Sequence, residues 1–284
     1  MAYSVQSINQ QVLIASSQNQ NPTQLDTLIF TDLLSATTPS TTSPAQGGVI
    51  YANAANGGAL TNNTPAHFTA FGITAASGVV SLSTGTTNNA TGYSALYTSN
   101  NILPGLPTPS NGLVTKYEFE ALIRTDSVIH SDAVRGFYRM GFGNSITNAD
   151  QSDGVYFEFL CNGTTTDTTW NVVFKKDGTE ERANTTVTVA ASKTYRMYLC
   201  VEVNPSGTYT TTYKIKNLTD NTNTENTASP STTARYPTAA GDYMGAFMTN
   251  SKTAIATVTA RLIFVDYIGF RLRRPIAREI LIFS

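Results

Sequence analysis

The sequence of 284 residues is poor in charged side chains, in cysteine and in histidine. Only 13% of its residues are Asp, Glu, Lys or Arg, where about 25% is usual for a soluble protein. The formal net charge of −1 provides no general attraction for nucleic acid or for an anionic membrane. The two cysteines, Cys161 and Cys200, are too few for a disulfide framework.

Long apolar runs and cofactor motifs are also missing from the sequence. No stretch of about 18 apolar residues occurs, and the first residues have neither the basic nor the apolar region of a signal peptide. We therefore expect no membrane segment, and we expect the chain to be made and folded in a cytoplasm. The two histidines, His67 and His130, have no Cys or His at metal-ligand spacing, which argues against a transition-metal site and a Ser-His-Asp triad. Without a Gly-rich phosphate loop, no cofactor is expected.

Thr, Asn, Ser and Gly dominate instead, and this composition favours β-structure. Thr is β-branched and suits a pleated surface, whereas Asn, Ser and Gly form turns. Residues 113–124 and 194–203 alternate apolar with polar side chains, which predicts two strands that are each buried on one face. The predicted buried positions are Tyr117, Phe119, Ala121, Ile123, Tyr195, Met197, Leu199, Val201 and Val203.

Further short apolar runs between turn residues predict more strands, about a dozen altogether. They occupy residues 79–84, 134–143, 154–160, 170–176, 208–216, 243–248 and 254–273. Residues 219–242 are long, polar and poor in apolar side chains, so we expect a surface loop there. The fold class is therefore all-β, a single antiparallel two-sheet sandwich over residues 24–272. A polar N-terminal arm (1–23) and a basic, apolar C-terminal tail (273–284) flank it.

Glu118 and Glu120 are the strongest candidates for catalysis. Two carboxylates two residues apart on a strand lie roughly 7 Å from each other, which suits glycoside hydrolysis. Alternating charge on a solvent-facing strand gives the same spacing without any function. The E-x-D-x-x-E strand of the sandwich-fold glucanases does not occur, and this argues against hydrolysis. We predict no catalytic residue.

Residues 148–160, NADQSDGVYFEFL, allow two interpretations. Asn148, Asp150, Ser152 and Asp153 offer oxygen ligands of the kind that Ca²⁺ prefers, but their spacing differs from that of an EF-hand loop. The favoured interpretation is a turn that leads into a core strand. Trp170 likewise is either a platform for a sugar ring or, as we prefer, a core residue.

The C-terminal segment combines basic and apolar side chains. Pro275 interrupts the preceding strand, so the tail is expected to leave the sheet. An exposed apolar end is prone to aggregate unless a partner covers it. We interpret the segment as a contact for a neighbouring chain, through strand addition and arginine–carboxylate pairs, with packing on its own domain as the alternative. The predicted contact residues are Arg271, Arg273, Arg274, Arg278, Ile280, Ile282 and Phe283.

In their order along the chain, several segments resemble the concanavalin-A-like lectin and glucanase jelly roll, in the form carried by structural proteins of tailed bacteriophages. The most specific are the T-G-T-T string at 84–87 and the D-G-V-Y-F-E-F string at 153–159. The resemblance implies two curved antiparallel sheets in a virion protein, without a catalytic motif. The D-x-[YF]-x-N metal pattern of the legume lectins is absent, so the resemblance carries over neither a metal site nor sugar binding.

We therefore expect a non-enzymatic structural protein on the capsid or tail surface of a bacteriophage virion. A capsid decoration or cement protein, bound to the particle through its terminal arms, is preferred. The expected partners are further copies of the same chain, with a trimer favoured, and virion proteins such as the major capsid protein. The alternative is a tail-fibre, spike or head-fibre adhesin that binds host surface glycans. A polysaccharide-cleaving enzyme is the third possibility considered.

Overall fold

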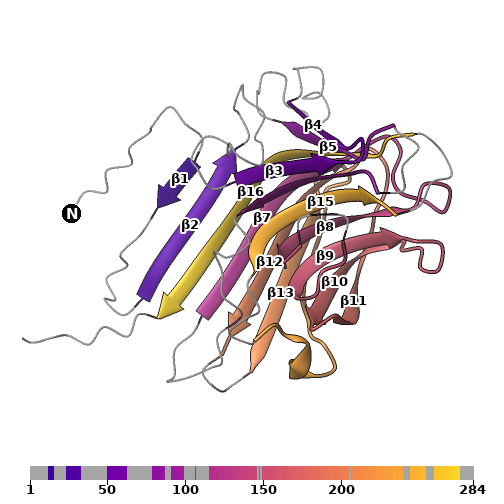
Figure 1. Ribbon diagram of the computed structural model, residues 1–284. Coiled ribbons are helices and arrows are strands. Elements are labelled where there is room, and N and C mark those ends of the chain that lie inside the picture. Colours follow the sequence, from indigo (N-terminus) through magenta and orange to yellow (C-terminus); the bar gives the residue numbers. More distant parts are fainter. Residues whose placement is uncertain are drawn as a thin grey trace, which may run out of the picture.

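The structure is a computed structural model that describes residues 12–15, 24–32, 50–62, 79–86, 91–98, 106, 115–145, 147, 149–204, 206, 208–238, 244–253 and 259–275. These residues form an antiparallel sandwich of a nine-stranded and a seven-stranded sheet, which confirms the predicted fold class (Figure 1). We call the nine-stranded sheet the back sheet and the seven-stranded sheet the front sheet. The face of each sheet that points away from the other sheet is its outer face.

The back sheet has the strand order β1-β2-β16-β7-β12-β13-β14, and β5 and β4 are attached beside β16. Its strands are β1 (Val12–Ala15), β2 (Gln24–Asp32), β4 (Ala59–Asn62), β5 (Val80–Ser83), β7 (Thr115–Thr125), β12 (Thr194–Val203), β13 (Tyr209–Asn217), β14 (Thr222–Ala228) and β16 (Leu262–Pro275).

The front sheet has the order β11-β10-β9-β8-β15-β6-β3. Its strands are β3 (Ile50–Ala55), β6 (Tyr93–Thr98), β8 (Gly136–Gly143), β9 (Gly154–Cys161), β10 (Thr169–Lys176), β11 (Thr179–Thr188) and β15 (Gly245–Lys252). A short 3₁₀ helix, η2 (Thr233–Arg235), lies between β14 and β15 in the chain.

The long strand β16 joins two parts of the back sheet. On one side it pairs with β7 along most of its length, with a register shift between Val265 and Tyr267. On the other side its first residues pair with β5, and residues from Tyr267 to Pro275 pair with β2. As a result, β1, β2 and the end of β16 form one lateral margin of the back sheet (Figure 1).

Aromatic side chains from both sheets fill the space between them. Tyr117 of β7 meets Phe142 of β8 edge to face, with ring centroids 6.0 Å apart. Trp170 of β10 and Tyr195 of β12 make a similar contact at 6.1 Å. Such geometry adds to the burial of apolar area that stabilises the sandwich.

The structure confirms the predicted faces of the two clearest strands. All nine predicted core positions on β7 and β12 are buried. The prediction for residues 219–242 was wrong in part, because β14 occupies Thr222–Ala228 as the edge of the back sheet. Most side chains of β14 are exposed, so this strand has little of the apolar periodicity on which the prediction depended.

Part of the predicted N-terminal arm and part of the predicted C-terminal tail belong to the back sheet. β1 lies within residues 1–23 and pairs with β2. At the other end β16 continues to Pro275, three residues into the predicted tail. Residues 276–284 lie outside the described part of the chain.

Candidate functional site

The outer face of the back sheet carries a regular array of polar side chains. It is produced by the strand register, because alternate residues on adjacent strands point to the same side. Tyr198 of β12 lies opposite Glu120 of β7 on one side and Lys214 of β13 on the other. In the next row, Arg196 lies opposite Lys216, which in turn lies opposite Asn223 of β14.

Both glutamates proposed from the sequence lie on this face, and both are held by hydrogen bonds. Glu118 accepts a hydrogen bond from the Tyr198 hydroxyl at 2.6 Å. Glu120 Oε1 accepts from the Tyr267 hydroxyl at 2.7 Å and from Arg196 Nε at 2.5 Å. The two carboxylates therefore orient tyrosine and arginine side chains beside them. Burial, together with the hydrogen bond to Glu118, raises the pKa of Tyr198, so that this hydroxyl stays protonated.

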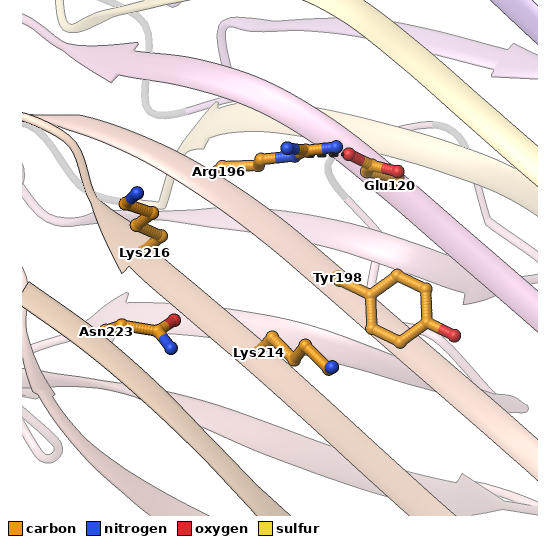
Figure 2. Close-up of a pocket in the computed structure, with 6 residues that line it drawn as sticks. All are labelled: Glu120, Arg196, Tyr198, Lys214, Lys216 and Asn223. Atoms are coloured by element: carbon orange, nitrogen blue, oxygen red, sulfur yellow. Dashed lines mark hydrogen bonds and ion pairs between the residues drawn. The ribbon is translucent and has the colours of Figure 1, made fainter.

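A shallow cavity of about 360 Å³ lies over this array. Figure 2 shows Arg196 turned toward Glu120, while two lysines project from the neighbouring strand. The cavity therefore has three cationic side chains and one carboxylate in its lining. The lining residues are Glu120, Arg196, Tyr198, Lys214, Lys216 and Asn223.

The outer face of the front sheet is different, because several of its charged side chains, among them Arg139, Glu158 and Lys175, are buried. Arg139 of β8 lies opposite Glu158 of β9, and the side chains are 6% and 0% exposed. Arg139 Nε donates to Glu158 Oε2, while Arg182 of β11 approaches Glu158 Oε1 at 3.2 Å. Two arginines thus neutralise one buried carboxylate, and the guanidinium of Arg139 also lies 4.0 Å from the ring centroid of Phe137.

The loop before β9 closes over this ion-pair cluster. Asp150 accepts from Arg139 at 2.9 Å and also from Lys175. Burial acts to raise the pKa of Asp150, but the hydrogen bond from Lys175 and the charges of both cations lower it overall. Asp153 instead accepts from Ser152 at 2.6 Å and from the backbone N–H of Asp177 at 3.0 Å.

The candidate calcium ligands therefore have different partners. Asn148 lies outside the described residues. Within the part of the chain that the structure describes, no group of three or more His, Cys, Asp or Glu side chains could hold a metal ion. The preferred interpretation of residues 148–160 is confirmed for the strand, because Val155, Phe157 and Phe159 belong to the core.

The structure also describes the tryptophan, both cysteines and one of the two histidines considered in the sequence. Trp170 is fully buried, which confirms the core interpretation. Cys161 and Cys200 are both free and buried. His130 is buried, and His67 lies outside the described residues. No helix among the described residues combines the length and the apolar character that a membrane crossing requires.

The predicted C-terminal contact residues are only partly described. Arg271 and Arg273 lie on β16, opposite Glu118 and Lys116 of β7, and the Arg271 Nε lies 3.8 Å from Glu118 Oε2. The backbone of Arg274 belongs to β16 and pairs with Leu25 of β2. Arg278, Ile280, Ile282 and Phe283 lie outside the described residues. The structure therefore places Arg271 beside the polar array of the back sheet.

Sequence reasoning missed the buried cluster of Arg139, Glu158 and Lys175. It treated strand alternation as a division between a buried and a solvent-facing side, whereas both sides of β8 and β9 are buried. A signal was present in the aromatic residues that flank Arg139 and Glu158 on their own strands, since a charge among large apolar side chains needs a partner.

Comparison with known proteins identifies the family. A family model described as "SO2946-like, C-terminal domain" matches residues 75–266. The chain belongs to the SO2946-like family. Its fold is similar to the crystal structure of a protein of unknown function, SO2946 from Shewanella oneidensis MR-1, with 17% identity and a TM-score of 0.57. That similarity covers 94% of this chain and 92% of the Shewanella protein.

The SO2946-like chain also shares its fold with concanavalin-A-like legume lectins. Peanut lectin is 10% identical, with a TM-score of 0.50 over 87% of this chain and 97% of the lectin. The lectin UEA-II, solved in complex with galactose, is 11% identical with a TM-score of 0.50 over 86% of this chain and 98% of the lectin. These similarities establish the concanavalin-A-like jelly roll. No curated protein sequence matches the chain.

Proposed function

We propose that this chain is a non-enzymatic structural protein of a bacteriophage virion, with the sandwich as a rigid body and the terminal segments as its attachment. The observation that carries the proposal is the position of β1, β2 and the end of β16 side by side at one margin of the back sheet (Figure 1). The first and last described strands thus lie at the same lateral margin of the back sheet, with β2 between them. The order of sequence segments that resemble phage structural proteins also supports it.

A non-enzymatic role is supported by the state of the candidate carboxylates. Glu120 and Glu118 each hold a tyrosine hydroxyl, and Glu158 is fully buried between two arginines. A general acid or base must reach the substrate with a carboxyl group that is able to exchange its proton. Polysaccharide turnover by the purified chain that is lost in Glu118→Gln would contradict this part of the proposal.

Attachment to the particle is tested by truncation. A chain without residues 276–284 is expected to fold and yet fail to enter particles, because the described core lies between residues 50 and 270 and the removed segment is the proposed attachment. Far-ultraviolet circular dichroism checks folding, and the protein content of purified particles measures incorporation. Lys176→Gln, a change on the front sheet, is the control and should be incorporated normally. Normal incorporation of the truncated chain refutes the attachment role.

A second candidate is an adhesin that binds glycans on a host surface. It is favoured by the cavity of about 360 Å³ on the outer face of the back sheet, a size within the usual range of small-ligand pockets. The shared fold of UEA-II, whose structure contains galactose, is consistent with this role. Binding of the isolated protein to a panel of neutral and acidic glycans tests it.

A further inference from the structure

An unusual pair of like charges lies in the cavity of the back sheet. Arg196 of β12 and Lys216 of β13 are directly opposite each other in the antiparallel register. Side chains in such positions have Cβ atoms about 4.5–5.5 Å apart, and like charges there destabilise the sheet. An anion that binds both side chains would remove the repulsion.

The neighbouring charges are neutralised, with one exception. Arg196 Nε donates to Glu120 at 2.5 Å, and Lys214 forms an ion pair with Glu225 at 2.6 Å. Lys216 has no ion-pair partner among the described residues, and on its other side it faces the amide of Asn223. The cavity therefore has one uncompensated positive charge, located at Lys216 beside a neutral hydrogen-bonding group.

The remaining lining suits a sugar better than a peptide. The hydroxyl of Tyr198 is held by Glu118, so the position of its ring is restrained at the wall of the cavity (Figure 2). Aromatic rings pack against the apolar faces of ligands. Glu120 accepts hydrogen bonds and Asn223 both donates and accepts, which matches sugar hydroxyls. An acidic peptide has few hydroxyl groups to pair with Glu120 and Asn223.

We propose that this cavity binds an acidic saccharide, with the carboxylate of a uronic-acid residue between Lys216 and Arg196. The sugar ring packs on Tyr198, and its hydroxyls bond to Glu120 and Asn223. This inference depends on the second candidate role, glycan binding, and is independent of attachment to a particle. It adds the ligand class and the site.

The test is isothermal titration of the full chain with tetragalacturonate, its methyl ester, a neutral galactan tetrasaccharide and polyglutamate. We expect binding of tetragalacturonate alone, weakened as salt is raised, because exposed charges are screened. Lys216→Gln is expected to weaken binding at least tenfold and Tyr198→Ala to abolish it, whereas Tyr198→Phe keeps the ring and most of the affinity. Lys176→Gln removes the same charge from the front sheet and should leave affinity unchanged.

The other outcomes distinguish failure of this acidic-saccharide site from failure of glycan binding in general. Equal binding of the methyl ester or of the neutral galactan would support a glycan role and overturn the acidic site. Equally tight binding of polyglutamate, or unchanged affinity of Lys216→Gln, would also overturn it. Absence of binding to every saccharide would overturn both the site and glycan binding. Thermal unfolding of each variant without ligand shows that lost binding does not come from lost folding.

Discussion

Arg139 and Glu158 face each other across β8 and β9 on the outer face of the front sheet, and both are buried. Burial raises the pKa of Glu158, while the charges of Arg139 and Arg182 oppose that effect. Removal of charges from water is costly, and it is offset only where the partners and their hydrogen bonds are all present. The pair is therefore a structural element that tolerates little change.

Glu158→Gln should destabilise the sandwich strongly. The substitution leaves two cations, Arg139 and Arg182, beside a neutral amide in a buried position. We expect the unfolding free energy to fall by about 3–5 kcal/mol, as for other broken buried ion pairs, measured by urea denaturation at neutral pH. The matched control is Glu225→Gln in the exposed pair with Lys214, where the loss should be below about 1 kcal/mol. Equal effects of the two substitutions would contradict the structural role of Glu158.

Asp150→Asn should release the loop before β9. Asp150 joins this loop to Arg139 and Lys175 through ion pairs, and an amide removes their charge attraction. Hydrogen exchange of the backbone amides of residues 149–153 should become faster, while exchange in β8 and β9 should change little. If the loop amides exchange as slowly as before, its other hydrogen bonds, such as those of Gln151, are sufficient to hold it.

The same loop should respond to acid in the wild-type chain. The folded-state pKa of Asp150 is lowered from 3.8, so its stabilisation is present above that value and is lost as pH falls through the folded pKa. We expect the protection of the loop amides, relative to an unstructured chain at the same pH, to persist at pH 4 and to fall at lower pH. In Asp150→Asn the loop amides should have little protection at both pH values. A wild-type loop that already opens between pH 6 and pH 5 would contradict this assignment.

His130 should make the stability depend on pH between 6.5 and 4. Burial lowers its pKa from 6.5 to about 4, and its Nε2 lies 2.9 Å from Asn250 Oδ1. The amide nitrogen of Asn250 donates to two backbone carbonyls, so Oδ1 faces the ring and the neutral imidazole donates from Nε2. Protonation would add a charge near Arg261 and Lys252.

The sign of this effect follows from the two pKa values. Between pH 6.5 and 4 the unfolded chain binds a proton at His130 that the folded chain does not, so the unfolding free energy falls as pH is lowered through this window. The total loss should be about 3 kcal/mol. Chemical denaturation at several pH values measures it. His130→Gln should be flatter over this range, and because His67 is present in both proteins the difference isolates His130. Parallel profiles would show that His130 is not the cause.

The sequence was sufficient to predict the sandwich and its clearest strands because one face of each is apolar. Tyr195 and Met197 alternate with Arg196 and Tyr198, and the structure has the same alternation. The edge strand β14 escaped prediction, because a strand that is exposed along most of its length needs no apolar period. Its position depends on pairing with β13, which is a tertiary interaction.

The candidate site could be predicted only in part, for a related reason. The sequence identified Glu118 and Glu120 but not their partners, because Tyr198, Arg196 and Tyr267 come from strands distant in the chain. The pairing of strands brings them together, and no local spacing encodes it. The opposition of Arg196 and Lys216 is likewise visible only once the register of β12 and β13 is known.

Lys216→Gln should leave the unliganded sandwich as stable as the wild type or slightly more stable. The lysine faces Arg196 across the sheet, and cross-strand charge pairs are worth roughly 0.2–1 kcal/mol. Loss of the repulsion should therefore raise the unfolding free energy by at most about 1 kcal/mol. Lys214→Gln is the matched comparison on the same strand: it breaks the pair with Glu225 and should give a small decrease. A clear loss of stability in Lys216→Gln would mean that the lysine supports the fold, because a residue kept for an external anion contributes nothing until the anion is bound.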